Sequence, residues 1–221
     1  MARYKSVCFL HGLGSSPEGT KAQYFREHFL RSEVPYVAPD LNTPDFTRQT
    51  VTAQLGLLSQ VMATLPKPVL LMGSSLGGWL AIRYSMLHPD ELAGVVLVAP
   101  VTRFNPEGLA RLTGSSMEQW RLEGAIPFMM DGWPQPQLLG FDLVLDAPAH
   151  EVHEAVLEVP VLALHGTADP LIPWEDTDRF VGQQRHGTCS LLLNCDHTLN
   201  NRLDVIAELM ANWEAKAPMR R

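Results

Sequence analysis

The chain has 221 residues, with 24 acidic and 17 basic side chains and a net charge of -7. This length fits one large domain, because domains run from about 100 to 200 residues and open α/β sheets reach about 250. The acidic balance argues against a protein that binds nucleic acid, since such binding depends on lysine and arginine. An apolar fraction of 46% with 19% charged residues excludes a disordered chain and indicates a globular one.

Signals for export or membrane insertion are not apparent. The chain reaches His11-Gly12 before any apolar stretch long enough for a signal peptide. Its best apolar run, 94–101, is less than half of the roughly 18 residues of a membrane helix. Cys189 and Cys195 lie about 20 Å apart if the chain from one to the other is extended as a strand, too far for a disulfide. We therefore expect free thiols and a cytoplasmic protein without a membrane span.

Short apolar runs alternate with longer amphipathic stretches along the chain. This alternation predicts βαβ units and an α/β fold with a doubly wound, mostly parallel sheet and helices on both faces. The expected strands are rich in Val and Leu, as strands buried on both faces should be, and lie at 6–10, 34–38, 69–72, 95–99, 161–164 and 189–193. The expected helices lie at 17–31, 48–65, 76–88, 175–184 and 201–215.

The stretch 102–159 interrupts this alternation. Proline and glycine at 105–108, 131–134 and 148 divide it into short helical pieces. The stretch is too long for a simple connection between a helix and a strand, and too short for a domain with its own core. We therefore expect a single domain, residues 1–221, with a small helical cap inserted at about 102–159.

A strand at 69–72 runs directly into Gly73-Ser74-Ser75-Leu76-Gly77-Gly78, and an apolar helix follows. This is the G-x-S-x-G nucleophile elbow in its required strand-turn-helix context. The residues two before and two after the nucleophile must be small, because the turn is tight. With Ser75 at the centre they are Gly73 and Gly77; with Ser74 they would be Met72 and Leu76. Ser75 is therefore the candidate nucleophile, although a simple Gly-Ser turn would give the same letters.

A serine nucleophile needs a histidine base and an acid that orients it, in the chain order Ser, acid, His on this type of sheet. The strand 161–164 ends in His165-Gly166-Thr167-Ala168-Asp169, which places Asp169 on a loop at the carboxyl end of the strand. The strand 189–193 ends in Asn194-Cys195-Asp196-His197. Asp169 is the candidate acid and His197 the candidate base.

Other assignments compete for these roles. Asp196 neighbours His197, but adjacent side chains on an extended segment point to opposite faces. Asp142 or Asp146 could supply the acid from an unusual position. His150 and His153 are three residues apart and could form a metal pair, but they lack the H-E-x-x-H pattern, and a solvated acidic face explains them better. We expect no metal.

The oxyanion of acyl transfer also needs hydrogen-bond donors. The backbone N–H of Leu76, directly after the nucleophile, is one candidate, and the N–H of Leu13 in the loop after the first strand is the other. That loop, Gly12-Leu13-Gly14, is also like a dinucleotide fingerprint, but Pro17 stands where the third glycine should be. We therefore expect no nucleotide and no other cofactor.

Large apolar side chains gather in the expected cap and beside the elbow. They could line an acyl pocket, or they could only pack the cap onto the core; they are Trp79, Phe104, Trp120, Phe128, Met129, Met130 and Trp133. His11 and His165 each end a strand just before glycine, which is typical of a buried, hydrogen-bonded histidine. Cys195 lies near His197 but not on an elbow, so a thiol nucleophile is not expected.

The motifs at Ser75, Asp169 and His197 resemble the α/β-hydrolase superfamily across essentially the whole chain. His11-Gly12-Leu13-Gly14-Ser15-Ser16-Pro17, followed by Lys21-Ala22, is similar to small bacterial YqiA-type esterases, which cleave simple carboxyl esters. The stretch 73–80 and Asp169-Pro170-Leu171-Ile172-Pro173-Trp174 are similar to abhydrolase-domain acyl-protein thioesterases, which remove palmitoyl groups from cysteine. The resemblance implies the same triad and a small-molecule acyl ester or thioester as substrate.

Three functions remain open from the sequence. A serine esterase for short to medium acyl chains is the first, and a long-chain acyl thioesterase, acting on acyl proteins or acyl-coenzyme A, is the second. The third is a non-catalytic receptor on a retained hydrolase fold, since fold alone does not decide function. Serine at the elbow argues against a dehalogenase, which would have Asp there, and a dienelactone hydrolase, which would have Cys. The oligomeric state does not follow from the sequence.

Overall fold

The computed structural model describes residues 3–42, 44–129 and 132–218. Its main sheet has six strands, all parallel, in the order β2-β1-β3-β4-β7-β8. The strands are β1 (Ser6–Leu10), β2 (Tyr36–Val37), β3 (Val69–Ser74), β4 (Leu92–Val98), β7 (Val161–Gly166) and β8 (Gly187–Leu192). The fold class predicted from the alternating pattern is confirmed.

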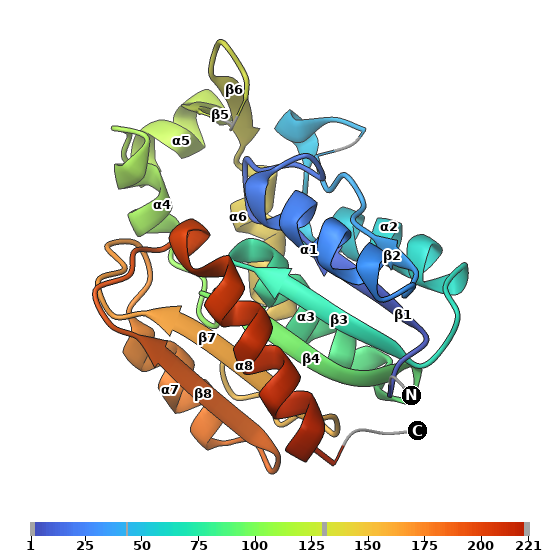
Figure 1. Cartoon of the computed structure of the whole chain (residues 1–221). Helices are drawn as coiled ribbons and strands as arrows, with labels where there is room; N and C mark the ends of the chain where they lie inside the picture. The colour runs from blue at the N-terminus through green and yellow to red at the C-terminus, as the bar shows by residue number, and fades with distance from the viewer. Residues whose placement is uncertain (1–2, 43, 130–131, 219–221) are drawn as a thin grey trace.

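Helices cover both faces of the sheet (Figure 1). Helices α2 (Val51–Ala63), α3 (Leu76–Leu87) and α7 (Trp174–Gly182) share one apolar core with the sheet. Helices α1 (Thr20–Arg31) and α8 (Leu203–Lys216) share the other. Helix α1 begins later than the sequence predicts, because Pro17 lies in a turn that the Gly19 N–H closes onto the Ser16 carbonyl at 3.0 Å.

The central strands owe their position to their composition. Every residue of β1, β3, β4 and β7 is buried, and the side chains on both faces are mostly apolar. Strand β8 lies at the sheet edge and is mostly exposed or half-buried. Parallel pairing brings the carboxyl ends of the strands to one side of the molecule, and the loops that follow β1, β3, β7 and β8 meet there.

The 102–159 segment lies between β4 and β7 and extends above the carboxyl ends of the strands (Figure 1). It contains α4 (Pro106–Leu112), α5 (Met117–Glu123), α6 (Asp142–Asp146) and the 3-10 helix η3 (Ala147–His150). It also contains an antiparallel hairpin of β5 (Ala125–Phe128) and β6 (Gln137–Gly140), which the expectation of helical pieces alone did not include.

The chain returns from this segment to β7 along 151–160, and buried polar groups fasten this return. The Gln184 side chain, after α7, accepts the N–H of Leu157 and donates to the carbonyl of Ala155, both at 2.8 Å. The Trp79 indole on α3 donates to the carbonyl of His150 at 2.8 Å. The last part of the segment is therefore fixed to α3 and to the residue that follows the end of α7.

Three short 3-10 helices complete the described fold. They are η1 (Phe46–Arg48), η2 (Pro89–Glu91) and η4 (Asn200–Arg202). Helix α8 follows η4 directly, so neither Asn200 nor its neighbour Asn201 caps it through a side chain.

Candidate active site

The turn between β3 and α3 holds Ser75 in a strained conformation. Ser75 has φ 54° and ψ -119°, a region that non-glycine residues rarely adopt and that costs about 1–3 kcal/mol. Its N–H donates to the carbonyl of Val98 at 3.0 Å, and its carbonyl accepts the N–H of Val101 at 3.0 Å. The end of β4 therefore holds the turn on both sides and keeps the serine at the tip.

The small residues of the elbow are required by contact. A Cβ at Gly77 would lie 2.2 Å from the carbonyl oxygen of Leu10, and a Cβ at Gly73 would lie 2.3 Å from that of Gly77. Both contacts are with backbone atoms, which cannot move aside as a flexible side chain can. The spacing rule that selects Ser75 over Ser74 thus has its physical basis here.

The three side chains selected from the sequence meet at the carboxyl ends of β3, β7 and β8. His197 Nε2 lies 3.0 Å from Ser75 Oγ, and His197 Nδ1 lies 2.7 Å from Asp169 Oδ2. An ionised Asp169 accepts only, so Nδ1 carries the proton and Nε2 is free to accept one from Ser75. This is the geometry of a nucleophile, a base and an orienting acid.

Asp169 is buried, with a side chain that is 0% exposed. Burial acts to raise the pKa of Asp169, but the hydrogen bonds from His165 and His197 outweigh it and hold that pKa well below the usual range. Asp169 Oδ1 accepts the backbone N–H groups of Leu171 at 2.8 Å and Ile172 at 3.0 Å. The acid is therefore ionised and fixed at both oxygens.

The loops that carry the acid and the base are joined to each other. The N–H of Ala168 donates to the carbonyl of Cys195, and the N–H of Asn194 donates to the hydroxyl of Thr167, both at 3.0 Å. A Cβ at Gly166 would lie 2.2 Å from the Cys195 carbonyl oxygen, so the two loops are in close contact. Their joining sets the distance between Asp169 and His197.

A protein-family model described as the alpha/beta hydrolase family matches residues 9–213 of this sequence. The chain belongs to that family. The family and the fold expected from the sequence are therefore confirmed, and so is the class of enzyme, a hydrolase.

Known proteins of this family show similarity at low identity. The bovine palmitoyl-protein thioesterase ABHD10, mitochondrial, is 24% identical over 222 residues, covering 90% of this chain and 69% of the relative. The Est1E structure from Butyrivibrio proteoclasticus, with ferulic acid bound, has a TM-score of 0.76 at 19% identity and covers 97% and 91% of the two chains. A monoacylglycerol lipase from Paleococcus ferrophilus has a TM-score of 0.73 at 21% identity, covering 94% and 93%. These structures share the alpha/beta hydrolase fold.

The competing acids lie elsewhere in this alpha/beta hydrolase. Asp196 turns its Oδ1 to Thr198 and Leu199, accepting their N–H groups at 3.0 and 3.1 Å. Asp146 accepts the N–H and hydroxyl of Thr52 at the start of α2, at 2.8 and 2.7 Å. Asp142 lies in the first turn of α6. Asp169 is the carboxylate that bonds His197.

The histidines considered for a metal also have other contacts. His150 Nε2 lies 2.8 Å from the Thr52 hydroxyl, and His153 Nδ1 lies 3.0 Å from Glu151 Oε2. Within residues 3–42, 44–129 and 132–218, no group of three or more His, Cys, Asp or Glu side chains could hold a metal ion. His186 also follows Asp169 in the chain, but it precedes β8 and lies at the opposite end of the sheet from Ser75.

The candidate oxyanion donors flank the serine. Leu76 is the first residue of α3, and the first N–H groups of a helix have no partner within it. The loop after β1 passes close to Ser75, since a Cβ at Gly12 would lie 3.2 Å from Ser75 Cβ. Leu13 follows Gly12 and packs against the core. The backbone of both segments thus runs beside the hydroxyl.

The expected pocket residues fall into two groups. Trp79 and Trp120 are 1% and 0% exposed, and their indoles donate to the carbonyls of His150 and Leu139. These two tryptophans pack the 102–159 segment, with Phe104 stacked on Trp79 at 5.1 Å. Buried in this way, they offer a substrate no open surface.

The second group faces outward. Met129 is 61% exposed and Trp133 is 50% exposed, while Phe128 is half-buried at the end of β5. Met130 lies outside the described residues. The Phe128 ring contacts the loop after β1, where a Cβ at Gly14 would lie 2.5 Å from it. A hollow of about 420 Å³ adjoins this ring, lined by Leu112, Thr113, Pro127, Phe128, Met129 and Pro136.

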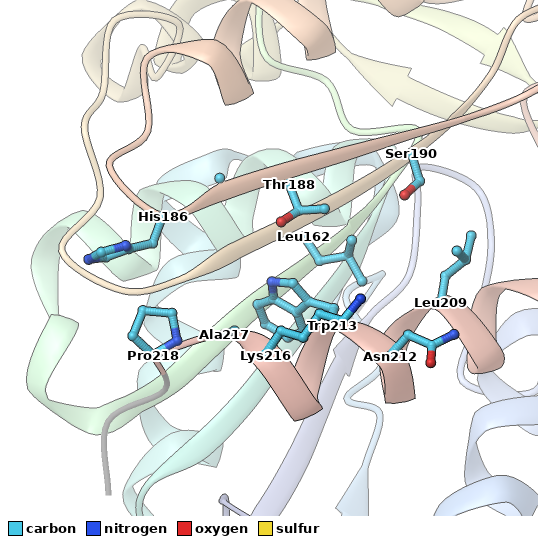
Figure 2. A pocket seen from close by; sticks show the side chains of 11 residues that line it. Leu162, His186, Thr188, Ser190, Leu209, Asn212, Trp213, Lys216, Ala217 and Pro218 are labelled. Atoms are coloured by element: carbon cyan, nitrogen blue, oxygen red, sulfur yellow. The ribbon is translucent and has the colours of Figure 1, made fainter.

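Another hollow, of about 350 Å³, lies between β8 and α8 (Figure 2). Thr188 and Ser190 of β8 face Trp213 and Lys216 of α8 across it. It includes Leu162, near the start of β7, whereas Asp169 follows the end of that strand. This hollow is therefore separate from the candidate active site.

The sequence did not predict that His165 contacts Asp169 or that Thr177 contacts His165. His165 Nε2 lies 2.9 Å from Asp169 Oδ2, and His165 Nδ1 lies 2.8 Å from the Thr177 hydroxyl on α7. His165 was expected to be a buried, hydrogen-bonded histidine, which it is, with 0% of its side chain exposed. Its spacing of four residues from Asp169 was the available signal. Thr177 carried no signal in the sequence.

Membrane insertion through a helix has no support in the described part of the chain. None of its helices combines the length and the apolar character that crossing a bilayer requires.

Proposed function

We propose that this alpha/beta hydrolase is a serine esterase that cleaves carboxylic esters of short to medium acyl chains. The supporting observation is the hydrogen-bonded series from Ser75 Oγ through His197 to Asp169, with distances of 3.0 and 2.7 Å. The strained elbow supports the proposal further, because it presents the serine hydroxyl at the tip of a turn. The proposed substrate is a small-molecule ester.

The first half of the proposed reaction forms an acyl-enzyme. His197 Nε2 takes the proton of the Ser75 hydroxyl while Oγ attacks the carbonyl carbon of the ester. The negative charge on the carbonyl oxygen is stabilised by the backbone N–H groups of Leu76 and Leu13. The C–O bond to the alcohol then breaks, and the leaving oxygen takes the proton from His197.

The second half releases the acid. A water molecule gives a proton to His197 Nε2 and attacks the acyl carbon, and the bond to Ser75 Oγ breaks as the serine regains its proton. Asp169 stays ionised throughout and stabilises the imidazolium of His197 in both halves. The protein's own groups perform every step, so the proposal includes no cofactor and no metal.

The test is kcat/KM over p-nitrophenyl esters from acetate to palmitate, with Ser75→Ala as the blank. A maximum at short or medium chains that disappears in Ser75→Ala supports the proposal. Equal rates in wild type and Ser75→Ala would exclude Ser75 as the nucleophile. Labelling by a fluorophosphonate probe, mapped to Ser75 by mass spectrometry, separates a catalytic protein from a receptor.

A second candidate is a thioesterase for long acyl chains on proteins or coenzyme A. The apolar hollow beside Phe128 favours it, because a long chain needs an apolar surface beyond the reacting carbonyl. The similarity to a palmitoyl-protein thioesterase adds support. Palmitoyl-coenzyme A and an S-palmitoyl peptide test it, and a rate on these above that on p-nitrophenyl butyrate would replace the first candidate.

The composition also bears on the compartment and the partners of the proposed enzyme. Three free cysteines, two of them buried, suit a reducing compartment, and we place the protein in the cytoplasm on this ground. A net charge of -7 makes nucleic acid an unfavourable partner. Fractionation of cells with an antibody to the protein tests the compartment, and recovery with mitochondria would contradict it.

A further inference from the structure

A second histidine bonds the same carboxylate oxygen of the candidate acid as the candidate base does. His165 is the fifth residue of β7, and its imidazole is fully buried between that strand and α7. Its Nε2 lies 2.9 Å from Asp169 Oδ2 and 3.2 Å from the carbonyl oxygen of Ile172. Both partners accept hydrogen bonds, so Nε2 must carry the proton.

The other nitrogen of this imidazole contacts a hydroxyl on α7. His165 Nδ1 lies 2.8 Å from the hydroxyl of Thr177, which can donate to an unprotonated nitrogen. A neutral ring with its proton on Nε2 satisfies every contact. In this tautomer the Thr177 hydroxyl donates to Nδ1. Thr177 is itself fully buried on α7, so the contact is held by the packing of that helix against β7.

Asp169 then has its full set of hydrogen bonds. Oδ1 accepts two backbone N–H groups from the following loop, and Oδ2 accepts one from each imidazole. The two backbone bonds hold Oδ1, and the two imidazoles hold Oδ2. Without His165, the one donor holding Oδ2 would be His197, the residue that Asp169 has to orient.

We propose that His165, set by Thr177, is a positioning residue that fixes Asp169 Oδ2 so that this oxygen can orient His197 toward Ser75. This inference rests on the proposed serine esterase and deepens it. His165 touches neither the substrate nor Ser75, and it acts through the acid alone. It also shares the negative charge of Oδ2 with His197.

The first test replaces His165 by Leu, which removes both ring nitrogens, and by Gln, whose amide can still donate. We expect His165→Leu to lower kcat on p-nitrophenyl butyrate about ten- to a hundredfold, the size of a misplacement effect, with KM changed less than about threefold. His165→Gln should recover part of the loss. Wild-type kcat in a folded His165→Leu variant would overturn the proposal.

The pH profile gives a readout that a packing role would not change. In His165→Leu the unshared charge on Oδ2 favours the imidazolium of His197, so the acid limb of kcat/KM should move to higher pH. Asp196, whose charge also acts on His197, is unchanged in the variant, as are the acidic residues of α7, Glu175, Asp176 and Asp178. An unmoved acid limb would contradict the proposal.

Thr177 supplies a matched pair if His165→Leu fails to fold. Thr177→Val keeps the shape and removes the hydroxyl, while Thr177→Ser keeps the hydroxyl. We expect Thr177→Val to lower kcat about three- to tenfold and Thr177→Ser to stay within about twofold of wild type. Equal losses in the two variants, or none in either, would overturn the role of the hydroxyl.

A spectroscopic measurement separates this inference from the proposed function. The Nδ1 proton of His197, bonded to Asp169 at 2.7 Å, should give a low-field proton NMR signal in Ser75→Ala protein. Adding His165→Leu should remove or shift that signal whether or not the wild type turns over any ester. An unchanged signal rejects the inference, whereas a changed signal in a protein without Ser75-dependent turnover rejects only the esterase.

Discussion

The strand ends and loops that carry the candidate triad and the 102–159 segment above them are built differently. The side chains of His165 and Asp169 are 0% exposed, and two hydrogen bonds join their loop to that of His197. Apolar side chains of the segment instead face solvent, with Leu112 at 58%, Met129 at 61% and Leu145 at 68% exposed. The first region is fixed by contacts, while the second leaves apolar surface open.

This difference separates two tasks of an enzyme. Groups that move protons need fixed distances, and the sheet supplies them by bringing strand ends together. Groups that select an acyl chain need shape and apolar surface, which loops and short elements above a sheet can vary. We therefore expect changes in the first region to act on kcat and stability, and changes in the second to act on substrate preference.

The largest effect is expected for Ser75→Ala. Loss of the nucleophile should lower kcat about 10⁴- to 10⁶-fold, because the members of a triad act as one unit. The fold should remain, since the alanine side chain fits wherever serine does. Steady-state kinetics measures kcat, and circular dichroism tests whether the fold remains. Adding His197→Ala should lower kcat little further, and a second loss of equal size would contradict a shared mechanism.

The next effect is expected for Gly77→Ala. The added Cβ would lie 2.2 Å from the Leu10 carbonyl oxygen, so the elbow must shift, at a cost of about 1–3 kcal/mol in the free energy of unfolding and a large loss of kcat. The matched control is Gly56→Ala on α2, where the Cβ would meet no atom within 4 Å. That change should stabilise the protein by about 0.5–1 kcal/mol, and urea unfolding compares the two.

The pH dependence of stability follows from Asp169. Its pKa is lowered by folding, so its contribution is present above the carboxyl's unfolded pKa of about 4 and is lost as pH falls below that value. The difference in unfolding free energy between wild type and Asp169→Asn should therefore shrink from pH 7 to pH 3. Urea titrations of both proteins at the two pH values measure it. A difference that grows toward pH 3 would contradict the assigned direction.

The smallest effect on the reaction is expected in the 102–159 segment. Phe128→Ala should lower kcat/KM for long-chain p-nitrophenyl esters about tenfold, because the ring lines the apolar hollow. The kcat/KM for the acetate should stay within about twofold of wild type. Leu145→Ala, an exposed position on α6, is the control. Equal effects on acetate and long-chain esters would show that Phe128 supports the oxyanion loop rather than the acyl chain.

The parts of the fold that the sequence predicts are those with strong local patterns. All six strands of the main sheet overlap the predicted ranges. The pattern is strongest for β1, β3, β4 and β7, because strands buried on both faces leave little room for polar residues. The β5–β6 hairpin was not predicted. Its strands have four residues each, with Pro127 in one of them, and such short strands carry too little pattern.

The candidate site likewise has a part that local sequence patterns predict and a part that depends on tertiary packing. Ser75, Asp169 and His197 were selected because motif, strand end and chain order agree, and the three side chains are hydrogen-bonded to one another in series. The link from His165 to Thr177 depends on how α7 packs against β7, which no local pattern encodes. The burial of Trp79 and Trp120 likewise follows from tertiary contacts. From the sequence, these two residues could either line an acyl pocket or pack the cap onto the core.

The return of the chain along 151–160 has a consequence for how such an enzyme can diversify. Gln184 and Trp79 fasten this return to α7 and α3, close to where β7 pairs with β4. We therefore expect residues 103–141 to tolerate changes of length between the side chains that pack into the core, such as Trp120 and Leu139, because the entropic cost of a longer loop rises only slowly with length. Descendants of one scaffold can acquire new substrates while inheriting the same chemistry.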